Sequence, residues 1–202
     1  MLHGLPLDCL PPGQGAGGYL VFLGRISPEK GPERAIEIAS RAGMPLVMAA
    51  KIDKVDRDYH RTCIEPLLGD PLIEFVGEVD DREKAALLGD ATALLFPIDW
   101  PEPFGLVMIE AMAVGTPVVA FRCGSVPEII EDGVTGFIVE SVDDAVAASL
   151  AAQKLDRRLI RGQFEARFSA ERMTRDYLAL YDEVLRHSTG APRPAAASAA
   201  DG

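Results

Sequence analysis

The chain has 202 residues, 48% hydrophobic and 25% charged, a composition typical of a globular domain with a sizeable core. The net charge of −11 and the lack of any basic run argue against nucleic acid as a partner. Three widely spaced cysteines without a C-x-x-C pair argue against a zinc site or a disulfide framework, and favour a reducing cytoplasm. The N-terminus lacks the basic start and apolar stretch of a signal peptide.

The first 18 residues predict an irregular leader. Its glycine-rich part, G-Q-G-A-G-G at 13–18, precedes the first predicted strand. A dinucleotide-binding fingerprint must follow a strand, so we expect this segment to be flexible instead.

Six short apolar runs then alternate with helical patterns. Each run is nearly continuous, as expected for strands covered on both faces. The predicted strands are 19–23, 46–50, 73–76, 93–96, 118–121 and 137–139. One helix is expected at 32–42, and Ser141 with Asp144 resembles a capping box that opens another. Strands that alternate with helices predict an α/β fold with a doubly wound parallel sheet, whose ligands bind beyond the carboxyl ends of the strands.

The first predicted strand leads into G-R-I-S-P-E-K-G at 24–31, and then directly into a helix. Arg25 and Lys30 are five positions apart in this loop, so both cations could converge on one diphosphate. Alternatively, each pairs with a nearby acid such as Glu29 or Glu33.

The segment E-P-F-G-L-V-M-I-E-A at 102–111 is the most informative of the chain. Glu102 falls in a proline-rich loop at 98–103, and Glu110 lies nearly two turns inside a helix predicted at 104–114. The free N–H groups of the first turn would lie between the carboxylates, which suits an anion with neighbouring hydroxyls. The alternative is a structural role without a ligand, in which Glu110 pairs with an arginine and Glu102 is a surface residue. Residues 104–121 are almost wholly apolar, but Glu110 and the breaker G-T-P argue against a membrane span.

After the fifth predicted strand comes C-G-S-V-P-E at 123–128, where Gly124 and Ser125 could bring backbone donors close to a ligand. Asp132-Gly133 reads as a plain turn. The last predicted helix carries an apolar stripe with no strand after it, made of Met173, Tyr177, Leu180, Tyr181 and Val184. Residues 188–202 have little to bury, so we expect a disordered tail.

Together these segments resemble a known family. The motifs G-R-x-x-x-x-K-G, E-P-F-G-x-x-x-x-E-A, G-T-P-V-V-A, G-S-V-P-E and D-G-x-T-G-F occur in the order seen in retaining, GT-B-type family 4 glycosyltransferases. The resemblance covers roughly 19–181 and only the C-terminal, nucleotide-sugar-binding half of that fold. It implies an interdomain-type leader at 1–18, a Rossmann-like domain at 19–152 and C-terminal helices at 153–187.

The resemblance also implies a role for each residue of the motifs. Arg25 and Lys30 would hold the donor diphosphate and neutralise the leaving group without a metal or another cofactor, and Glu110 would bind the ribose. The predicted site residues are Gly24, Arg25, Lys30, Glu102, Phe104, Gly105, Leu106, Glu110, Gly124 and Ser125. Of these, Glu102 and the amides of residues 104–106 would hold the donor sugar and its phosphate.

No counterpart of the family's N-terminal acceptor domain is found, so we expect weak donor binding and little transfer by this chain alone. The expected partners are a nucleotide sugar and either the missing domain or a second copy of the chain. A stand-alone nucleotide-binding module that works with a separate partner chain is the alternative. Glycoside hydrolysis by Glu102 and Glu110 is disfavoured, because a carboxylate two turns into a helix is poorly placed to face a scissile bond.

Overall fold

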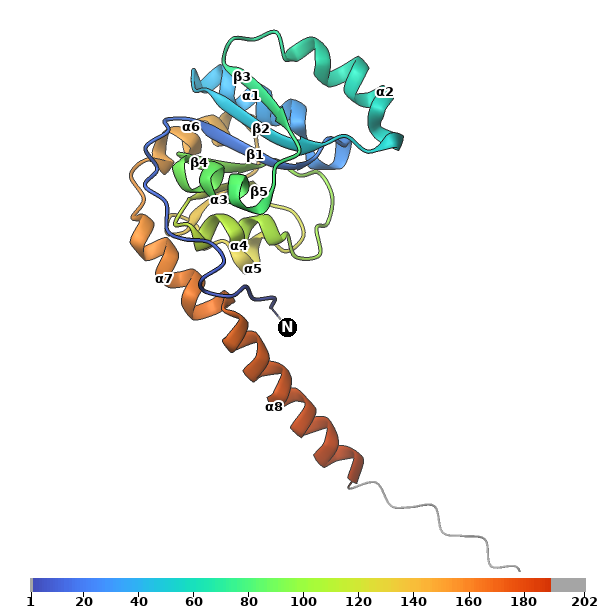
Figure 1. Cartoon of the computed structure of the whole chain (residues 1–202), viewed down its shortest axis with the longest axis vertical. Helices are drawn as coiled ribbons and strands as arrows, with labels where there is room; N and C mark the ends of the chain where they lie inside the picture. The colour runs from blue at the N-terminus through green and yellow to red at the C-terminus, as the bar shows by residue number, and fades with distance from the viewer. Residues whose placement is uncertain (1, 190–202) are drawn as a thin grey trace, which may run out of the picture.

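A six-stranded sheet organises the chain (Figure 1) in the order β3-β2-β1-β4-β5-β6, and every neighbouring pair of strands is parallel. The computed structural model describes residues 2–189. The strands are β1 (Leu20–Arg25), β2 (Leu46–Lys51), β3 (Ile73–Gly77), β4 (Ala93–Phe96), β5 (Val118–Phe121) and β6 (Gly136–Val139). The predicted doubly wound parallel sheet is confirmed, and β1 runs two residues further than expected.

Helices cover both faces of the sheet. They are α1 (Pro32–Ala42), α2 (Arg57–Tyr59), α3 (Asp81–Asp90), α4 (Leu106–Ala113), α5 (Val126–Ile129), α6 (Val142–Ala152), α7 (Arg157–Phe168) and α8 (Ala170–Thr189), with short turns η1 (Pro28–Lys30), η2 (Lys54–Asp56), η3 (His60–Ile64) and η4 (Glu65–Leu67). One buried cluster lies under α3, α4 and α7, and a second lies under α1 and α6. Because β1, β4, β5 and β6 contribute side chains to both clusters, these strands need the continuous apolar runs seen in the sequence.

Local capping fixes where the helices begin. The Ser141 side chain accepts a hydrogen bond from the Asp144 N–H, as predicted, and Asp80 and Glu83 form a full capping box at the start of α3. The predicted start of α4 at residue 104 is wrong. Gly105 has φ of 77°, a left-handed conformation that cannot continue a helix, so it is the N-cap and α4 begins at Leu106.

The leader, residues before β1, has irregular structure but is held to the domain by backbone hydrogen bonds. The N–H groups of Gly13, Gly15 and Gly17 donate to the carbonyl oxygens of Val114, Gly89 and Asp90, each at 2.9 Å. A Cβ atom on Gly13 would lie 2.1 Å from the Gly89 oxygen. These glycines therefore let the backbone lie against α3 and α4, which the expectation of a flexible segment missed.

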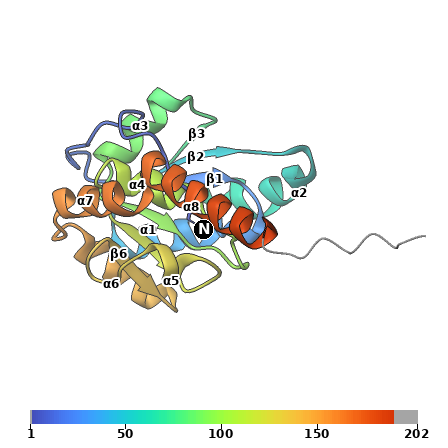
Figure 2. The same ribbon diagram turned by 90° about the horizontal axis from the view of Figure 1, so that it is seen from below.

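The start of the described chain lies beside the junction of α7 and α8 (Figure 1, Figure 2). The Leu5 N–H donates to the Phe168 carbonyl and the Ala170 N–H to the Leu5 carbonyl, both at 2.9 Å. Arg172 adds hydrogen bonds to the Leu2 and His3 carbonyls, both at 2.9 Å. These contacts hold the leader against the last two helices.

Helix α8 projects away from the rest of the molecule (Figure 1). Its apolar side chains are exposed, among them Tyr177, Leu178, Leu180, Tyr181, Val184 and Leu185. By contrast, Phe164 and Phe168 of α7 are fully buried in the domain's own core. No helix within residues 2–189 is both long and apolar enough to cross a membrane. The predicted tail begins at residue 188, but α8 continues to Thr189, and the remainder lies outside the described residues.

Candidate functional site

Strands β1 and β4 are neighbours in the sheet, while the chain leaves them in opposite directions across it. In open α/β sheets the crevice at such a switch point is the usual place for a ligand. The loops that follow these strands carry Lys30 and Glu102. Lys30 Nζ forms an ion pair with Glu102 Oε2, and only 18% and 13% of the two side chains are exposed. The structure therefore brings together two predicted site residues from loops far apart in the sequence.

Trp100 completes this pair, although the sequence analysis did not select it. Its indole Nε1–H donates to the same Glu102 oxygen at 3.0 Å, and Lys30 Nζ lies 5.0 Å from the centre of the indole ring. The D-W-P-E spacing offered a signal, since an indole two residues before a carboxylate can reach it. Nothing in the sequence indicated which way the ring would turn.

The loop after β5 braces the loop that carries Glu102. The Ser125 N–H donates to the Glu102 carbonyl at 3.0 Å, and the Ser125 hydroxyl donates to the Phe104 carbonyl at 2.7 Å. Gly124 has φ of 54°, and a Cβ atom there would lie 2.4 Å from the Glu102 backbone. Gly124 and Ser125 were predicted to offer backbone donors to a ligand. In this arrangement the Ser125 donors are occupied and the glycine allows a close approach of two loops.

The amino end of α4 lies directly after this loop. Met108 N–H donates to the Gly105 carbonyl at 3.0 Å, whereas the N–H groups of Leu106 and Val107 have no acceptor inside the helix. Phe104, expected within the helix, lies in the loop, and its ring contacts His3 edge-on with centroids 4.6 Å apart. The first turn thus offers the free donors that were predicted, two residues later than expected.

Glu110 lies on the second turn of α4 and faces α3. Its Oε1 accepts from Lys84 Nζ at 2.8 Å, and Lys84 also pairs with Asp81 at 3.1 Å. Burial by itself lowers the pKa of Lys84, but the contacts with Glu110 and Asp81 outweigh it and raise this pKa above its ordinary value. The ion pair that the alternative expected for Glu110 is present, with a lysine in place of an arginine. Sixteen per cent of the carboxylate side chain remains exposed.

Arg25 does not share a partner with Lys30. It pairs with Glu29 at 3.3 Å and with Asp53 at 3.6 Å, and 47% of its side chain is exposed. Backbone hydrogen bonding, with help from the cations of Arg25 and Lys30, lowers the pKa of Glu29 and keeps that side chain charged. Gly24 lies inside β1 rather than after it, with open space where a Cβ atom would stand. The two predicted clamp cations, Arg25 at the end of β1 and Lys30 in η1, therefore have separate partners.

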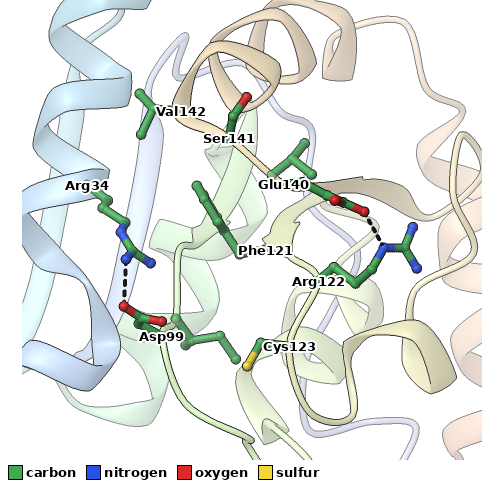
Figure 3. Close-up of a pocket in the computed structure, with 10 residues that line it drawn as sticks. Arg34, Asp99, Phe121, Arg122, Cys123, Glu140, Ser141 and Val142 are labelled. Atoms are coloured by element: carbon green, nitrogen blue, oxygen red, sulfur yellow. Dashed lines mark hydrogen bonds and ion pairs between the residues drawn. The ribbon is translucent and has the colours of Figure 1, made fainter.

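A cleft of about 480 Å³ lies at the same edge of the sheet (Figure 3). Two ion pairs border it, Arg34 with Asp99 at 2.6 Å and Arg122 with Glu140 at 3.0 Å. None of the predicted site residues lines it, and only Cys123 adjoins them in the sequence. The charged side chains that border this cleft pair with one another, and neither Lys30 nor Glu102 lines it. The cleft is therefore separate from the Lys30–Glu102 pair.

Within residues 2–189, no group of three or more His, Cys, Asp or Glu side chains is arranged to hold a metal ion.

A known protein family matches the part of the chain that contains these loops. The family model described as "Glycosyl transferases group 1" matches residues 15–169. The chain belongs to this family. Phosphatidyl-myo-inositol mannosyltransferase of Mycobacterium leprae is 30% identical over 199 residues, covering 91% of this chain and 51% of that protein. The predicted resemblance to glycosyltransferases is therefore confirmed.

Solved structures agree on the fold. Sucrose-phosphate synthase from Thermosynechococcus elongatus superposes with a TM-score of 0.78 at 22% identity, covering 92% of this chain and 52% of that one. Anabaena HepE in complex with UDP superposes with a TM-score of 0.76 at 20% identity, covering 89% and 56%. The group 1 glycosyl transferase chain described here thus has the Rossmann-like, GT-B type of α/β fold. It spans about half the length of these similar proteins.

Proposed function

We propose that this chain supplies the donor-binding half of an enzyme that transfers a glycosyl group from a nucleotide-diphosphate sugar with retention of configuration. The observation that carries the proposal is the Lys30–Glu102 pair, which places a cation and a carboxylate together at the switch point. Family membership and the solved complex of Anabaena HepE with UDP support it.

The leaving group of such a reaction is a nucleoside diphosphate, whose charge grows as the bond to the sugar breaks. Lys30 would contact this diphosphate from beside Glu102, and Arg25 would leave its exposed pairs with Glu29 and Asp53 to join it. Preformed cations and amide donors stabilise a developing negative charge in this way. The chemistry would then need no metal.

The two carboxylates would bind hydroxyl groups on opposite sides of the diphosphate. Glu110 would accept hydrogen bonds from the ribose, next to Lys84, and Glu102 would do so from the donor sugar. The free N–H groups at the start of α4, with Gly105 as the N-cap, would bind a phosphate oxygen.

We expect the acceptor site and the opposite wall of the donor site to lie outside these residues. The expectation is supported by the part of its relatives that the chain spans, about half, and by the exposed apolar face of α8. Exposed apolar patches tend to be covered by association. We expect either a second domain or a weak homodimer there. The alternative, a nucleotide-binding module that works with a separate partner chain, is favoured by the same exposed face.

Titration calorimetry of the 202-residue chain with UDP-, GDP- and ADP-sugars tests the proposal and identifies the base. Binding of one of these donors, with negligible multiple-turnover transfer, is the expected result. No binding of any nucleotide would overturn the proposed function, and robust transfer by the chain alone would overturn the idea of half an enzyme. Sedimentation that shows a monomer at high concentration would remove the homodimer.

We also propose a cytoplasmic location. The thiols of Cys9, Cys63 and Cys123 are free, which suits a reducing compartment.

A further inference from the structure

Trp100 occupies a position that the proposed roles of the motif residues leave unexplained. Its indole Nε1–H donates to Glu102 Oε2 at 3.0 Å, and the same oxygen contacts Lys30 Nζ. Among residues 2–189, no hydrogen bond reaches the other carboxylate oxygen, Oε1. Two donors on one oxygen leave the second oxygen of Glu102 as a ready acceptor.

The two donors differ in how strongly they fix the carboxylate. Lysine carries a compact charge on a flexible stem and can follow the oxygen through many rotations of the carboxyl group. An indole is rigid and donates in one direction, so it selects one rotation. The ring of Trp100 also lies 5.0 Å from Lys30 Nζ, a distance at which the ammonium group is attracted to the ring face.

The backbone of Trp100 is itself well held. Its carbonyl accepts hydrogen bonds from the Glu102 N–H at 2.8 Å and from Cys123 Sγ at 2.9 Å. The preceding residue, Asp99, donates its N–H to the Glu29 carbonyl at 2.9 Å and pairs with Arg34 at 2.6 Å. The indole is therefore mounted on a loop that is anchored to β1–α1 on one side and to the β5–α5 loop on the other.

We infer that Trp100 is a positioning residue that turns Glu102 Oε1 toward a hydroxyl of the donor sugar. The inference rests on the proposed function, because it assumes that Glu102 binds the sugar of a nucleotide-diphosphate sugar. It assigns Trp100 to recognition of the sugar and not of the nucleotide. Its effect should therefore appear in the difference in affinity between a nucleotide sugar and the matching nucleoside diphosphate.

The test compares Kd values by calorimetry for UDP and UDP-glucose, for GDP and GDP-mannose, and for ADP and ADP-glucose, using the full chain. The wild-type chain should bind one sugar nucleotide more tightly than its nucleoside diphosphate. Trp100→Phe keeps an aromatic ring but removes the donor, and should reduce this preference about tenfold while the affinity for the nucleoside diphosphate stays unchanged. Trp100→His restores a ring N–H and should recover part of the preference.

Two controls separate positioning from loss of structure. Glu140→Gln weakens an exposed pair with Arg122 and touches neither Glu102 nor the contacts that hold the Trp100 loop, so it should leave the preference intact. In a Glu102→Gln background, Trp100→Phe should cause no further loss, because the carboxylate that it orients is gone.

The outcomes separate a failure of the proposed function from a failure of the role assigned to Trp100. A wild-type chain that binds none of the six nucleotides would overturn the proposed function, and this inference with it. A wild-type preference that survives in Trp100→Phe would overturn the role of Trp100 alone. Equal losses for the sugar nucleotide and the nucleoside diphosphate would also overturn it, since they would indicate a purely structural role.

Discussion

Glu102 and Glu110 lie eight positions apart and each pairs with a lysine, but their surroundings differ in kind. The Glu102 pair joins the loops that follow two neighbouring strands, and the backbone there depends on Trp100, Gly124 and Ser125 for its shape. The Glu110 pair joins two helices on one side of the sheet, where regular helix hydrogen bonds already hold the backbone. A loop carboxylate can thus be displaced by a change in a neighbour, whereas a helical one can be altered only directly. The following substitutions separate the two.

The largest effect is expected for Gly124→Ala. The new Cβ atom would lie 2.4 Å from the Glu102 backbone, so the loop at 97–105 must move. Affinity for the nucleotide sugar should fall about a hundredfold, as expected for displacement of a positioned group by about 1 Å. Affinity for the nucleoside alone should persist, because Glu110 is untouched. Calorimetry with both ligands measures the difference.

Gly43→Ala is the matched control for Gly124→Ala. Gly43 also has a positive φ, 63°, but open space surrounds the position of its Cβ atom. Both variants should lose about 1–2 kcal/mol of stability from the strained backbone, and only Gly124→Ala should lose sugar-nucleotide binding. Equal affinities in the two variants would mean that the contact with Glu102 does not shape the site.

The sequence predicted the strands and the two carboxylates of this comparison, but not the partners of the carboxylates. The strands at 93–96 and 118–121 were placed without error, because a continuous apolar run between turn residues has few alternatives. Both carboxylates were selected as well, since charge inside an apolar segment is costly. Lys84 was missed as a partner because its contact with Glu110 depends on how α3 packs on α4, and local spacing carries no such information. Trp100 was missed although its spacing from Glu102 offered a signal, because nothing in the sequence fixed the direction of its ring.

The start of α4 shows a different kind of limit. The apolar pattern accommodates Phe104 as readily as Leu106, and only the left-handed conformation of Gly105 decides between them. That conformation goes with close packing, since a Cβ atom on Gly105 would lie 2.7 Å from Met108 Cε and 3.1 Å from the Phe96 ring. A tertiary contact therefore selects the boundary, and sequence patterns place such boundaries to within a few residues at best.

Lys30→Ala should have the next largest effect. Nucleoside diphosphate binding should weaken by roughly 1.5–3 kcal/mol, the range for hydrogen bonds to charged groups, and binding of the bare nucleoside should barely change. The fold should also lose about 1–3 kcal/mol, because Glu102 is left largely buried without its cation. Arg25→Ala should weaken binding similarly, but its exposed pairs contribute only about 0–1 kcal/mol to folding.

Calorimetry and thermal melting together measure both properties of Lys30→Ala and Arg25→Ala. If either variant lost nucleoside and nucleoside diphosphate affinity equally, the shape of the loop and not its charge would be what matters.

Glu110→Gln should have a smaller effect than Lys30→Ala. The amide keeps the shape but halves the acceptor capacity, so nucleoside affinity should fall by about 1 kcal/mol. Folding should change little, since Lys84 keeps its pair with Asp81 at 3.1 Å. A collapse of the melting temperature with normal affinity would instead make Glu110 a structural residue. Differential scanning fluorimetry beside the titration distinguishes these results.

The smallest effect concerns pH and Lys84. Its pKa is raised in the folded protein, so the stabilisation is fully present below the unfolded value of about 10.4 and is lost as pH rises through the folded pKa. From pH 7 to about pH 10, Lys84→Met should therefore have a lower melting temperature than the wild type, which corresponds to a loss of up to about 1 kcal/mol in the free energy of unfolding. At higher pH the melting temperatures of the two proteins should converge. Melting curves across this range test it. A constant difference up to pH 11.5 would mean that packing of the stem, not charge, stabilises the protein.

Strands β1 and β4, which join the two halves of the sheet, pair over a short length. Only Leu20 with Ala93 and Val21 with Leu94 are paired in register across this junction, and the partners are distant in the sequence. Strands β1 to β3 can associate with one another through local connections, and so can β4 to β6, before this junction closes. Long-range parallel pairing of this kind is slow compared with local contacts. Lys30 and Glu102 meet only once the two half-sheets have joined, so a ligand that needs both would report on the last step of folding and not on the first.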